Sequence, residues 1–316
     1  MIEVTELTKY YGARRALDRC SFRIGQGEIV GLVGKNGAGK TTILKILSGQ
    51  LLPTEGQAMI DGQSVEDNSI AARAKIGYLP EIPPLYGEMT VSNYLRFACR
   101  LRGVPSEQTE NRVIKAVYYT GLKEVATQRL GTLAKGYQQR VGIAQAIIHS
   151  PPVVLLDEPM ASLDPIQIVQ IRDLILSLKN QHTVLFSSHI LSEVTQICER
   201  VILLDEGTIK AQGREDEIRS ELLHRRRLSL LIRGTSDRLK EVLAPLGNIE
   251  MVIEPFDGRK GSELISASIT TEQDIREQVG RMCVEGGLGL LELREERHGL
   301  EHLMLQLLEG GGSEPS

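Results

Sequence analysis

Residues 28–42 read EIVGLVGKNGAGKTT. The apolar residues that open this segment predict a short buried strand running into a glycine-rich turn, and the apolar spacing of residues 40–47 predicts a helix directly after the turn. The turn matches the P-loop pattern, in which backbone N–H groups point inward around an anion. This strand, loop and helix together predict an α/β fold with a nucleotide site at their junction.

The chemistry of phosphate binding explains the residue types in the loop. A side chain at Gly34 or Gly39 would block the close approach of the backbone to a phosphate. Lys40 supplies a positive charge between the terminal phosphates, and Thr41 offers a hydroxyl group to Mg²⁺. Kinases, GTPases and ATPases share this loop, so it leaves the class open. The predicted nucleotide-binding residues are Gly34, Lys35, Asn36, Gly37, Ala38, Gly39, Lys40, Thr41 and Thr42.

Two further apolar runs end in polar residues. Residues 153–156 lead into Asp157 and Glu158, and residues 183–186 lead into Ser187, Ser188 and His189. Ligands bind at the carboxyl ends of the strands in open α/β sheets, so we expect one shared site at these ends. Asp157 would hold Mg²⁺ and Glu158 would accept a proton from the attacking water. Without the upstream P-loop, an acidic pair at a strand end would more simply be a helix cap.

The chain is long enough for one large and one small domain. We expect the first at residues 1–215, with an antiparallel β subdomain at its start and a helical insert at about 90–150. A small α+β domain at 216–309 and a disordered tail at 310–316 would follow. The small domain has the element order of a ferredoxin-like unit: strands at 228–233, 249–254, 263–269 and 288–294, and helices at 237–246, 273–285 and 300–308.

Composition excludes several classes of function. The formal net charge of −4 and the isoelectric point near 6.0 give no electrostatic reason to expect nucleic acid. The four cysteines are far apart and contain no Cys-x-x-Cys pair, which argues against a zinc site and a disulfide framework. No stretch reaches the roughly 18 apolar residues that a membrane-spanning helix needs. A role in transport would therefore require another protein to cross the membrane.

With these motifs in place, the chain resembles the ATP-binding subunits of ABC transporters, over roughly residues 2–213. It is most similar to the prokaryotic export type, whose ATPase and membrane subunits are separate chains. The resemblance implies ATP and Mg²⁺ as cofactors, Tyr11 as the ring that stacks on adenine, and Lys40, Glu158 and His189 as catalytic residues. Leu133 and the four residues after it resemble the signature loop that binds the partner subunit's γ-phosphate: Ala134, Lys135, Gly136 and Tyr137.

Two positions depart from the family pattern. Ala134 stands where the signature loop usually has serine, which removes one hydroxyl donor to a phosphate and puts full ATPase strength in doubt. Glu81 stands where the family often has a glutamine that senses Mg²⁺ and passes the signal to the membrane subunit. A carboxylate can still bind Mg²⁺, so the predicted metal ligands are Thr41, Asp157 and Glu81.

The resemblance predicts an ATPase that pairs head to tail, as a homodimer or with a related ATPase subunit. It would be cytoplasmic and peripheral on the inner face of the cell membrane, where it would drive a separate integral membrane permease, with export favoured over import. A soluble ABC-type ATPase acting on a ribosome or DNA is one alternative. The absence of a second P-loop and of sustained heptads counts against it. A non-hydrolysing regulatory module is the other, and the intact Lys40, Asp157, Glu158 and His189 count against that.

Overall fold

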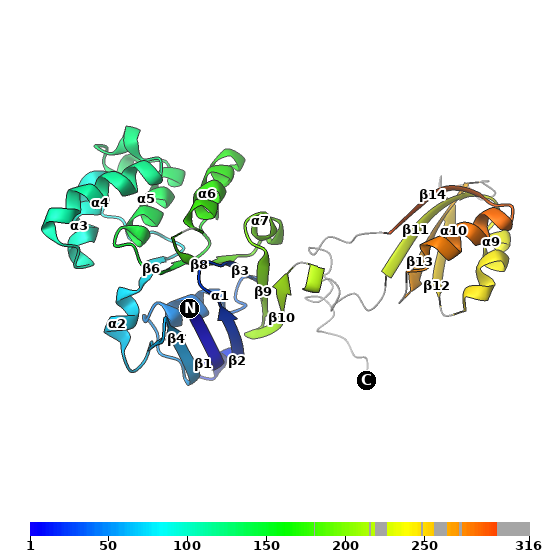
Figure 1. The fold of residues 1–316 in the computed structure, drawn as a ribbon, viewed down its shortest axis with the longest axis horizontal. Coiled ribbons are helices and arrows are strands. Elements are labelled where there is room, and N and C mark those ends of the chain that lie inside the picture. The colour runs from blue at the N-terminus through cyan, green and yellow to red at the C-terminus, as the bar shows by residue number, and fades with distance from the viewer. Residues whose placement is uncertain are drawn as a thin grey trace. The chain divides into compact units, whose positions relative to one another are not determined.

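The protein was analysed as a computed structural model that describes residues 1–179, 181–214, 216–218, 226–247, 249–255, 264–271 and 274–295. The chain divides into two compact units, Met1–Glu215 and Asp216–Ser316, and each is described by itself (Figure 1). The predicted helix at 300–308 and the predicted tail at 310–316 lie outside the described residues.

A six-stranded sheet forms the centre of the first unit, in the order β10-β9-β3-β8-β7-β6. Five strands are parallel and the edge strand β10 is antiparallel. β3 and β7 are apolar and buried along their whole length, as expected for a parallel sheet covered on both faces. The bounds are β3 (Ile29–Val33), β6 (Ile76–Leu79), β7 (Val153–Leu156), β8 (Thr183–Ser188), β9 (Arg200–Asp205) and β10 (Thr208–Arg214).

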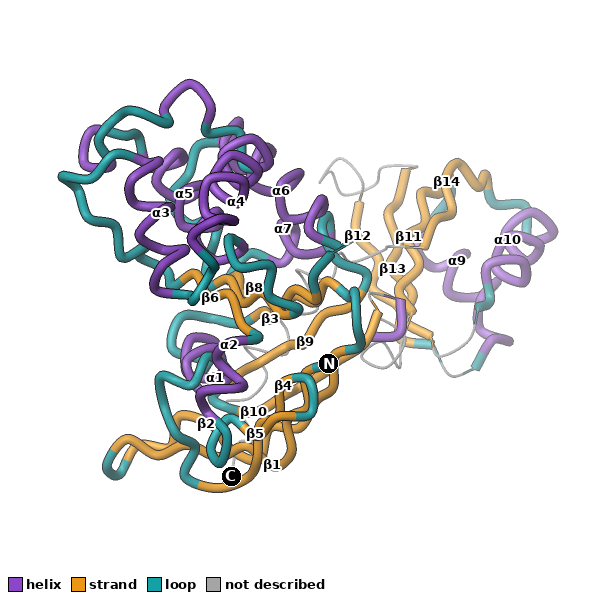
Figure 2. The backbone as a smooth tube through the Cα atoms, turned by 60° about the vertical axis from the view of Figure 1, so that its left-hand side comes forward, coloured by secondary structure: helices purple, strands orange, loops and turns teal. Residues whose placement is uncertain are grey.

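The two faces of this sheet contact different partners, because successive side chains of a strand point to opposite faces. On β8, Leu185 belongs to the core shared with α1 (Lys40–Leu47), whereas its neighbours Val184 and Phe186 do not. The other face is covered by α5 (Lys135–Ile147), which contacts β6 and β7, and by α7 (Leu191–Thr195), which contacts β3, β8 and β9. Figure 2 shows the sheet between these groups of helices.

An antiparallel sheet of order β2-β1-β4-β5 encloses α1 from the other side. Side chains of β1, β2 and β4 join those of α1 and the central sheet in one apolar core, so the two sheets and the helix form a single packed body. The bounds are β1 (Ile2–Tyr11), β2 (Arg14–Ile24), β4 (Glu55–Ile60) and β5 (Gln63–Ser64), and the short helix α2 (Ser69–Ala74) follows.

Helices predominate between residues 90 and 150, as predicted. α3 (Val91–Leu101), α4 (Ser106–Tyr119) and α5 pack around a core of their own with the short 3₁₀ turns η1 (Lys123–Val125) and η2 (Leu130–Thr132). The helix α6 (Pro165–Leu178) comes after β7, and Asp164 caps it by accepting a hydrogen bond from the Gln167 N–H at 2.9 Å. Among the helices of the insert, α5 connects it to the sheet by its contacts with β6 and β7.

Among its described residues, the second unit has a four-stranded antiparallel sheet, packed with the helices α9 (Ser236–Leu243) and α10 (Arg276–Glu285). Its sheet order, β12-β13-β11-β14, and its chain order of strand, helix, strand, strand, helix, strand are those of a ferredoxin-like fold. The predicted fold class, an α/β P-loop core followed by a small α+β domain, is confirmed. The bounds are β11 (Arg226–Arg233), α9 (Ser236–Leu243), η3 (Ala244–Leu246), β12 (Glu250–Pro255), β13 (Leu264–Thr271), α10 (Arg276–Glu285) and β14 (Gly289–Glu295).

Candidate active site

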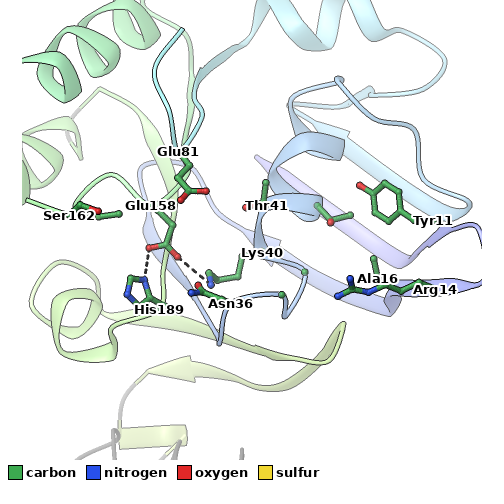
Figure 3. A pocket seen from close by; sticks show the side chains of 14 residues that line it. Tyr11, Arg14, Ala16, Asn36, Lys40, Thr41, Glu81, Glu158, Ser162 and His189 are labelled. Atoms are coloured by element: carbon green, nitrogen blue, oxygen red, sulfur yellow. Dashed lines mark hydrogen bonds and ion pairs between the residues drawn. The ribbon is translucent and has the colours of Figure 1, made fainter. Parts of the chain in front are cut away.

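A cavity of about 630 Å³ opens at the carboxyl ends of β3, β7 and β8, which are neighbours in the central sheet. This volume is within the range of small-molecule sites. Residues from segments far apart in the sequence line it, and most of the residues predicted for the nucleotide site are among them (Figure 3). The lining residues are Tyr11, Arg14, Ala16, Asn36, Gly37, Gly39, Lys40, Thr41, Thr42, Glu81, Glu158, Ala161, Ser162 and His189.

The loop between β3 and α1 requires glycine at the two positions singled out in the sequence. A Cβ on Gly34 would lie 2.2 Å from the Leu204 carbonyl oxygen, which the backbone could not accommodate. Gly39 has φ of 110°, and a Cβ there would lie 2.8 Å from the Ala16 carbonyl oxygen. The close packing of this loop against β2 and β9 therefore fixes its path into the first turn of α1.

Lys40 is buried beneath the loop, with 5% of its surface exposed. Its Nζ donates to the Gly34 and Lys35 carbonyl oxygens at 2.7 and 3.2 Å, and lies 3.3 Å from Oε1 of Glu158. The other carboxylate oxygen of Glu158, Oε2, lies 2.9 Å from Nδ1 of His189. Figure 3 shows Glu158 between Lys40 and His189. A buried carboxylate is thus held by a lysine on one side and a histidine on the other.

Asp157 points toward the first turn of α1 and is 1% exposed. The hydroxyl groups of Thr41 and Ser187 donate to its Oδ1 at 3.2 and 2.7 Å. Burial raises the pKa of this carboxyl group, the two hydroxyl donors oppose that rise, and the negative charges of Glu158 and Glu81 add to it. A nearby cation would offset both the cost of burying this negative charge and its repulsion by Glu158 and Glu81.

The surroundings of Asp157 fit Mg²⁺. Its Oδ2 is buried and has no hydrogen-bond partner in the described part of the chain, and the Thr41 hydroxyl is beside it. Oxygen ligands of this kind suit Mg²⁺, which binds through one or two carboxylates together with substrate phosphates. Glu81 lines the same cavity, yet no three acidic, histidine or cysteine side chains converge on a metal position within the described ranges.

Tyr11 and Arg14 lie at the opposite end of the cavity from Glu158 (Figure 3). They face each other across the end of the β1–β2 hairpin, in register. Tyr11 is exposed, at 47%, and lines the cavity. The resemblance predicts that adenine stacks on Tyr11, and the cavity runs from this ring to Lys40.

The predicted signature loop does not line this cavity. Leu133 and Lys135 instead line a neighbouring hollow of about 650 Å³ that shares Glu81, Ala161 and Ser162 with it. Ala134 is the residue that caps α5, and it gives the helix no side-chain hydrogen bond. The N-terminus of α5 suits an anion, but it does not line the P-loop cavity of the same chain.

Sequence reasoning assigned no role to two residues of the site. Arg14 begins β2 and reaches the P-loop, where its Nη2 lies 3.8 Å from the position of a Cβ on Gly37. The only sequence feature that could have indicated a role for Arg14 is its place as a cationic residue three positions after Tyr11. Ser187 is fully buried and bonds both to Asp157 and to the Glu158 backbone. It was visible only as one of several polar residues at a strand end.

Comparison with known proteins gives a consistent family. The ABC transporter family model matches residues 17–161. The bacitracin transport ATP-binding protein BcrA of Bacillus licheniformis is 31% identical over 313 residues, which cover 98% of each chain. The ABC transporter ATP-binding protein YxlF of Bacillus subtilis is 37% identical over 221 residues, which cover 70% of this chain and 73% of that protein.

Solved structures agree. A structure of an ATP-binding subunit of an ABC transporter has a TM-score of 0.64 and 32% identity, covering 70% of this chain and 92% of that one. A dimeric ATP-binding cassette in a post-hydrolysis state, bound to ADP and Pi, has a TM-score of 0.62 and 27% identity, covering 68% and 98%. Among the described residues, no helix has the length and apolar character needed to cross a membrane.

Proposed function

This chain belongs to the ABC transporter family and is an ATPase, and we propose that it drives transport through a separate integral membrane permease. Two ATPase subunits would pair head to tail, each P-loop facing the signature loop of the other. The pair would be two copies of this chain, or this chain with a related subunit. The position would be peripheral, on the inner face of the membrane, where the permease contacts it near Glu81 and the helical insert.

The arrangement of the two hollows carries this proposal. The P-loop, Glu158 and His189 surround one cavity, whereas Leu133 and Lys135 line the next. A helix end that favours an anion therefore lies beside the nucleotide cavity without contributing to it. A second ATPase subunit would bring its own signature loop to the open side of the nucleotide. ATP would then stabilise the pair, and hydrolysis would release it.

The residues of the cavity divide the reaction between them. Lys40 would hold the terminal phosphates and Glu158 would accept the proton of the attacking water. His189 orients the Glu158 carboxylate, with Nδ1 at 2.9 Å from Oε2. Thr41 and Asp157, with Glu81 at the wall, would hold Mg²⁺, which neutralises the charge on the phosphates. Lys40 Nζ lies 3.3 Å from Oε1 of Glu158, so terminal phosphates bound by Lys40 would compete with this carboxylate.

Purified protein with Glu158→Gln tests the proposal directly. Loss of the base should lower phosphate release by about 10²- to 10⁴-fold, while the variant still binds ATP and forms a stable dimer with it. Size-exclusion chromatography with light scattering measures the dimer. Glu199→Gln, an exposed carboxylate on the same unit, is the matched control and should behave as wild type. If the wild-type chain binds ATP but neither pairs nor hydrolyses it, a different ATPase subunit or the permease completes the site.

Ala134→Ser tests the signature loop. Serine at the α5 cap should stabilise the helix by about 0.5 to 2 kcal/mol, and its hydroxyl should also tighten ATP-dependent pairing. Thermal unfolding without nucleotide measures the first effect and dimer affinity with ATP measures the second. An increase in stability with no change in pairing or turnover would show that this hydroxyl position does not meet the partner's nucleotide.

The full-length similarity to two bacitracin transport ATP-binding proteins, from Bacillus licheniformis and Enterococcus faecalis, supports a test of bacitracin as cargo. Cells that carry the chain with its permease should survive higher bacitracin concentrations than cells carrying Glu158→Gln. Equal survival, with the ATPase intact in vitro, would exclude bacitracin and leave the motor function untouched.

A further inference from the structure

Ser187 is a fully buried serine at the carboxyl end of β8, next to the two carboxylates of the site. Its Oγ donates to Oδ1 of Asp157 at 2.7 Å and accepts the backbone N–H of Glu158 at 2.8 Å. One hydroxyl group thus joins the side chain of Asp157 to the main chain of Glu158. Both partners follow β7, the neighbour of β8, so the link crosses between two strands.

The backbone that this hydroxyl holds is unusual. Glu158 has φ of 47°, in the left-handed region that residues other than glycine rarely adopt. Such a conformation persists only where the surroundings enforce it. The Ser187 hydroxyl bonds the Glu158 N–H directly, at the peptide that precedes the strained torsion.

From this backbone position the carboxylate of Glu158 reaches Lys40 and His189. Its two oxygens lie 3.3 Å from Lys40 Nζ and 2.9 Å from His189 Nδ1. If the Glu158 peptide relaxed to negative φ, the side chain would leave in another direction and both distances would lengthen. General-base catalysis depends on placing the carboxylate within hydrogen-bond reach of water, so such a shift would act on turnover.

We propose that Ser187 is a positioning residue for ATP hydrolysis: its hydroxyl fixes the Glu158 peptide in the left-handed conformation and ties it to Asp157. The proposal rests on the roles proposed above for Glu158 and Asp157. It concerns the hydroxyl group, not the packing of the side chain, because both hydrogen bonds are made by Oγ.

The neighbouring Ser188 shows that the arrangement is particular to Ser187. Its Oγ accepts the Ile190 N–H at 3.0 Å and lies 3.0 Å from Oε2 of Glu193, and so organises the turn after β8. Neither bond involves Asp157 or Glu158. Successive residues of one strand point to opposite faces, and only Ser187 points to the end of β7.

A pair of near-isosteric variants isolates the hydroxyl. Ser187→Thr and Ser187→Val place the same extra carbon in the buried site, but only threonine keeps the donor and acceptor. We expect kcat for ATP to fall about 30-fold more in the valine variant than in the threonine variant, which corresponds to about 2 kcal/mol in the activation barrier. Affinity for a fluorescent ATP analogue should stay within threefold of wild type in both, so the effect appears in kcat and not in binding.

Two controls separate positioning from folding. Ser48→Ala removes another buried serine hydroxyl, which donates to the Lys45 carbonyl oxygen at 3.1 Å and contacts neither carboxylate. The Ser48→Ala variant should lose an amount of stability similar to that lost by Ser187→Val, as measured by urea unfolding, and should keep the wild-type kcat. In a Glu158→Gln background, Ser187→Val should lower the residual turnover by less than twofold, because Ser187 acts through Glu158.

The inference is overturned if Ser187→Val and Ser187→Thr have the same kcat, or if Ser187→Val lowers turnover by the same factor with and without Glu158. Its failure is distinct from failure of the proposed function. If Glu158→Gln alone retains wild-type turnover, the assignment of the base is wrong. If Glu158→Gln is inactive and Ser187→Val is fully active, the base stands and the role of Ser187 falls.

Discussion

The two units of this chain bury different kinds of side chain. Of the buried polar and charged residues described, all but Thr271 belong to the first unit, and they include Lys40, Asp157 and Glu158. The core of the second unit consists of apolar side chains from its four strands and two helices. The first unit therefore holds charges in its interior, whereas the second, as far as it is described, follows the common rule that cores are apolar.

Burying charge costs stability unless the charges are paired, and removing one partner of a buried pair is more destabilising still. In the first unit the buried pair of Lys40 and Glu158 lies at the carboxyl ends of the central strands, where both residues line one cavity. The comparison shows that the first unit accepts a cost in stability at the proposed nucleotide site. The second unit has no equivalent site within its described residues, and its own fold is the property that can be tested.

The largest expected difference concerns core truncation. Ile232→Ala in β11 and Leu185→Ala in β8 each remove a fully buried side chain, and each should cost about 2 to 5 kcal/mol. Because each unit has a core of its own, Ile232→Ala should lower only the second unit's transition and leave ATP turnover within twofold of wild type. Leu185→Ala should lower the first unit's transition and the temperature at which activity is lost. Urea unfolding followed by circular dichroism measures both, and a single shared transition would contradict this division.

Nucleotide binding should stabilise one unit only. In Glu158→Gln protein, where we expect slow turnover, Mg-ATP at a hundred times its dissociation constant should stabilise the first unit by about 2.7 kcal/mol. The second unit's transition should not move, because none of its described residues lines the nucleotide cavity. Differential scanning calorimetry with and without Mg-ATP measures both transitions. An equal shift of the two would mean that ATP binding couples them.

The smallest expected difference concerns acid. Burial, aided by the positive charge of Arg102, lowers the pKa of His149 to about 4, against an ordinary value of 6.5. Between pH 6.5 and 4 the unfolded chain therefore binds more protons at His149 than the folded chain does. The stability that the neutral His149 contributes is fully present above pH 6.5 and is lost as the pH falls toward 4. Because His149 is not fully buried, we expect the free energy of unfolding of the first unit to fall by roughly 2 kcal/mol over this pH range.

His149→Gln provides the matched measurement, because it keeps a polar side chain of similar size that does not titrate. The difference in unfolding free energy between wild type and variant should shrink between pH 7 and pH 4.5. None of the described residues of the second unit is a histidine, so its transition should show no such change. A constant difference across this range would mean that His149 has the same pKa in the folded and the unfolded chain.

Much of the fold followed from local patterns. The helix predicted at residues 40–47 and the strand at 153–156 were found at those bounds. In the second unit, the alternating apolar residues of β13 gave its place to within a residue or two. Boundaries shifted where side chains do not decide them: β8 extends to Ser188, beyond the predicted end at Phe186, because the parallel ladder with β3 continues to Ser188.

The candidate site was predictable where function depends on residue type at fixed spacing. The P-loop, the pair Asp157 and Glu158, and His189 after the next strand are patterns of this kind. P-loop residues, Glu158 and His189 line the cavity, and Asp157 accepts a hydrogen bond from Thr41 of the lining. Arg14 and Ser187 were not predicted to have a role, since an arginine beside a turn or a serine at a strand end is common in any protein. Their surroundings, not their identities, distinguish them.

By itself the sequence determined the family, the alternation of strands and helices and the residue types of the phosphate loop. These features depend on neighbours along the chain or on spacing within one turn. Only the tertiary structure decided that β3, β8 and β7 lie side by side, that Lys40 pairs with Glu158, and that Glu158 adopts a left-handed backbone. The reason is distance along the chain: the bond from Thr41 to Asp157 joins residues 116 positions apart, and local preference carries no information over that separation.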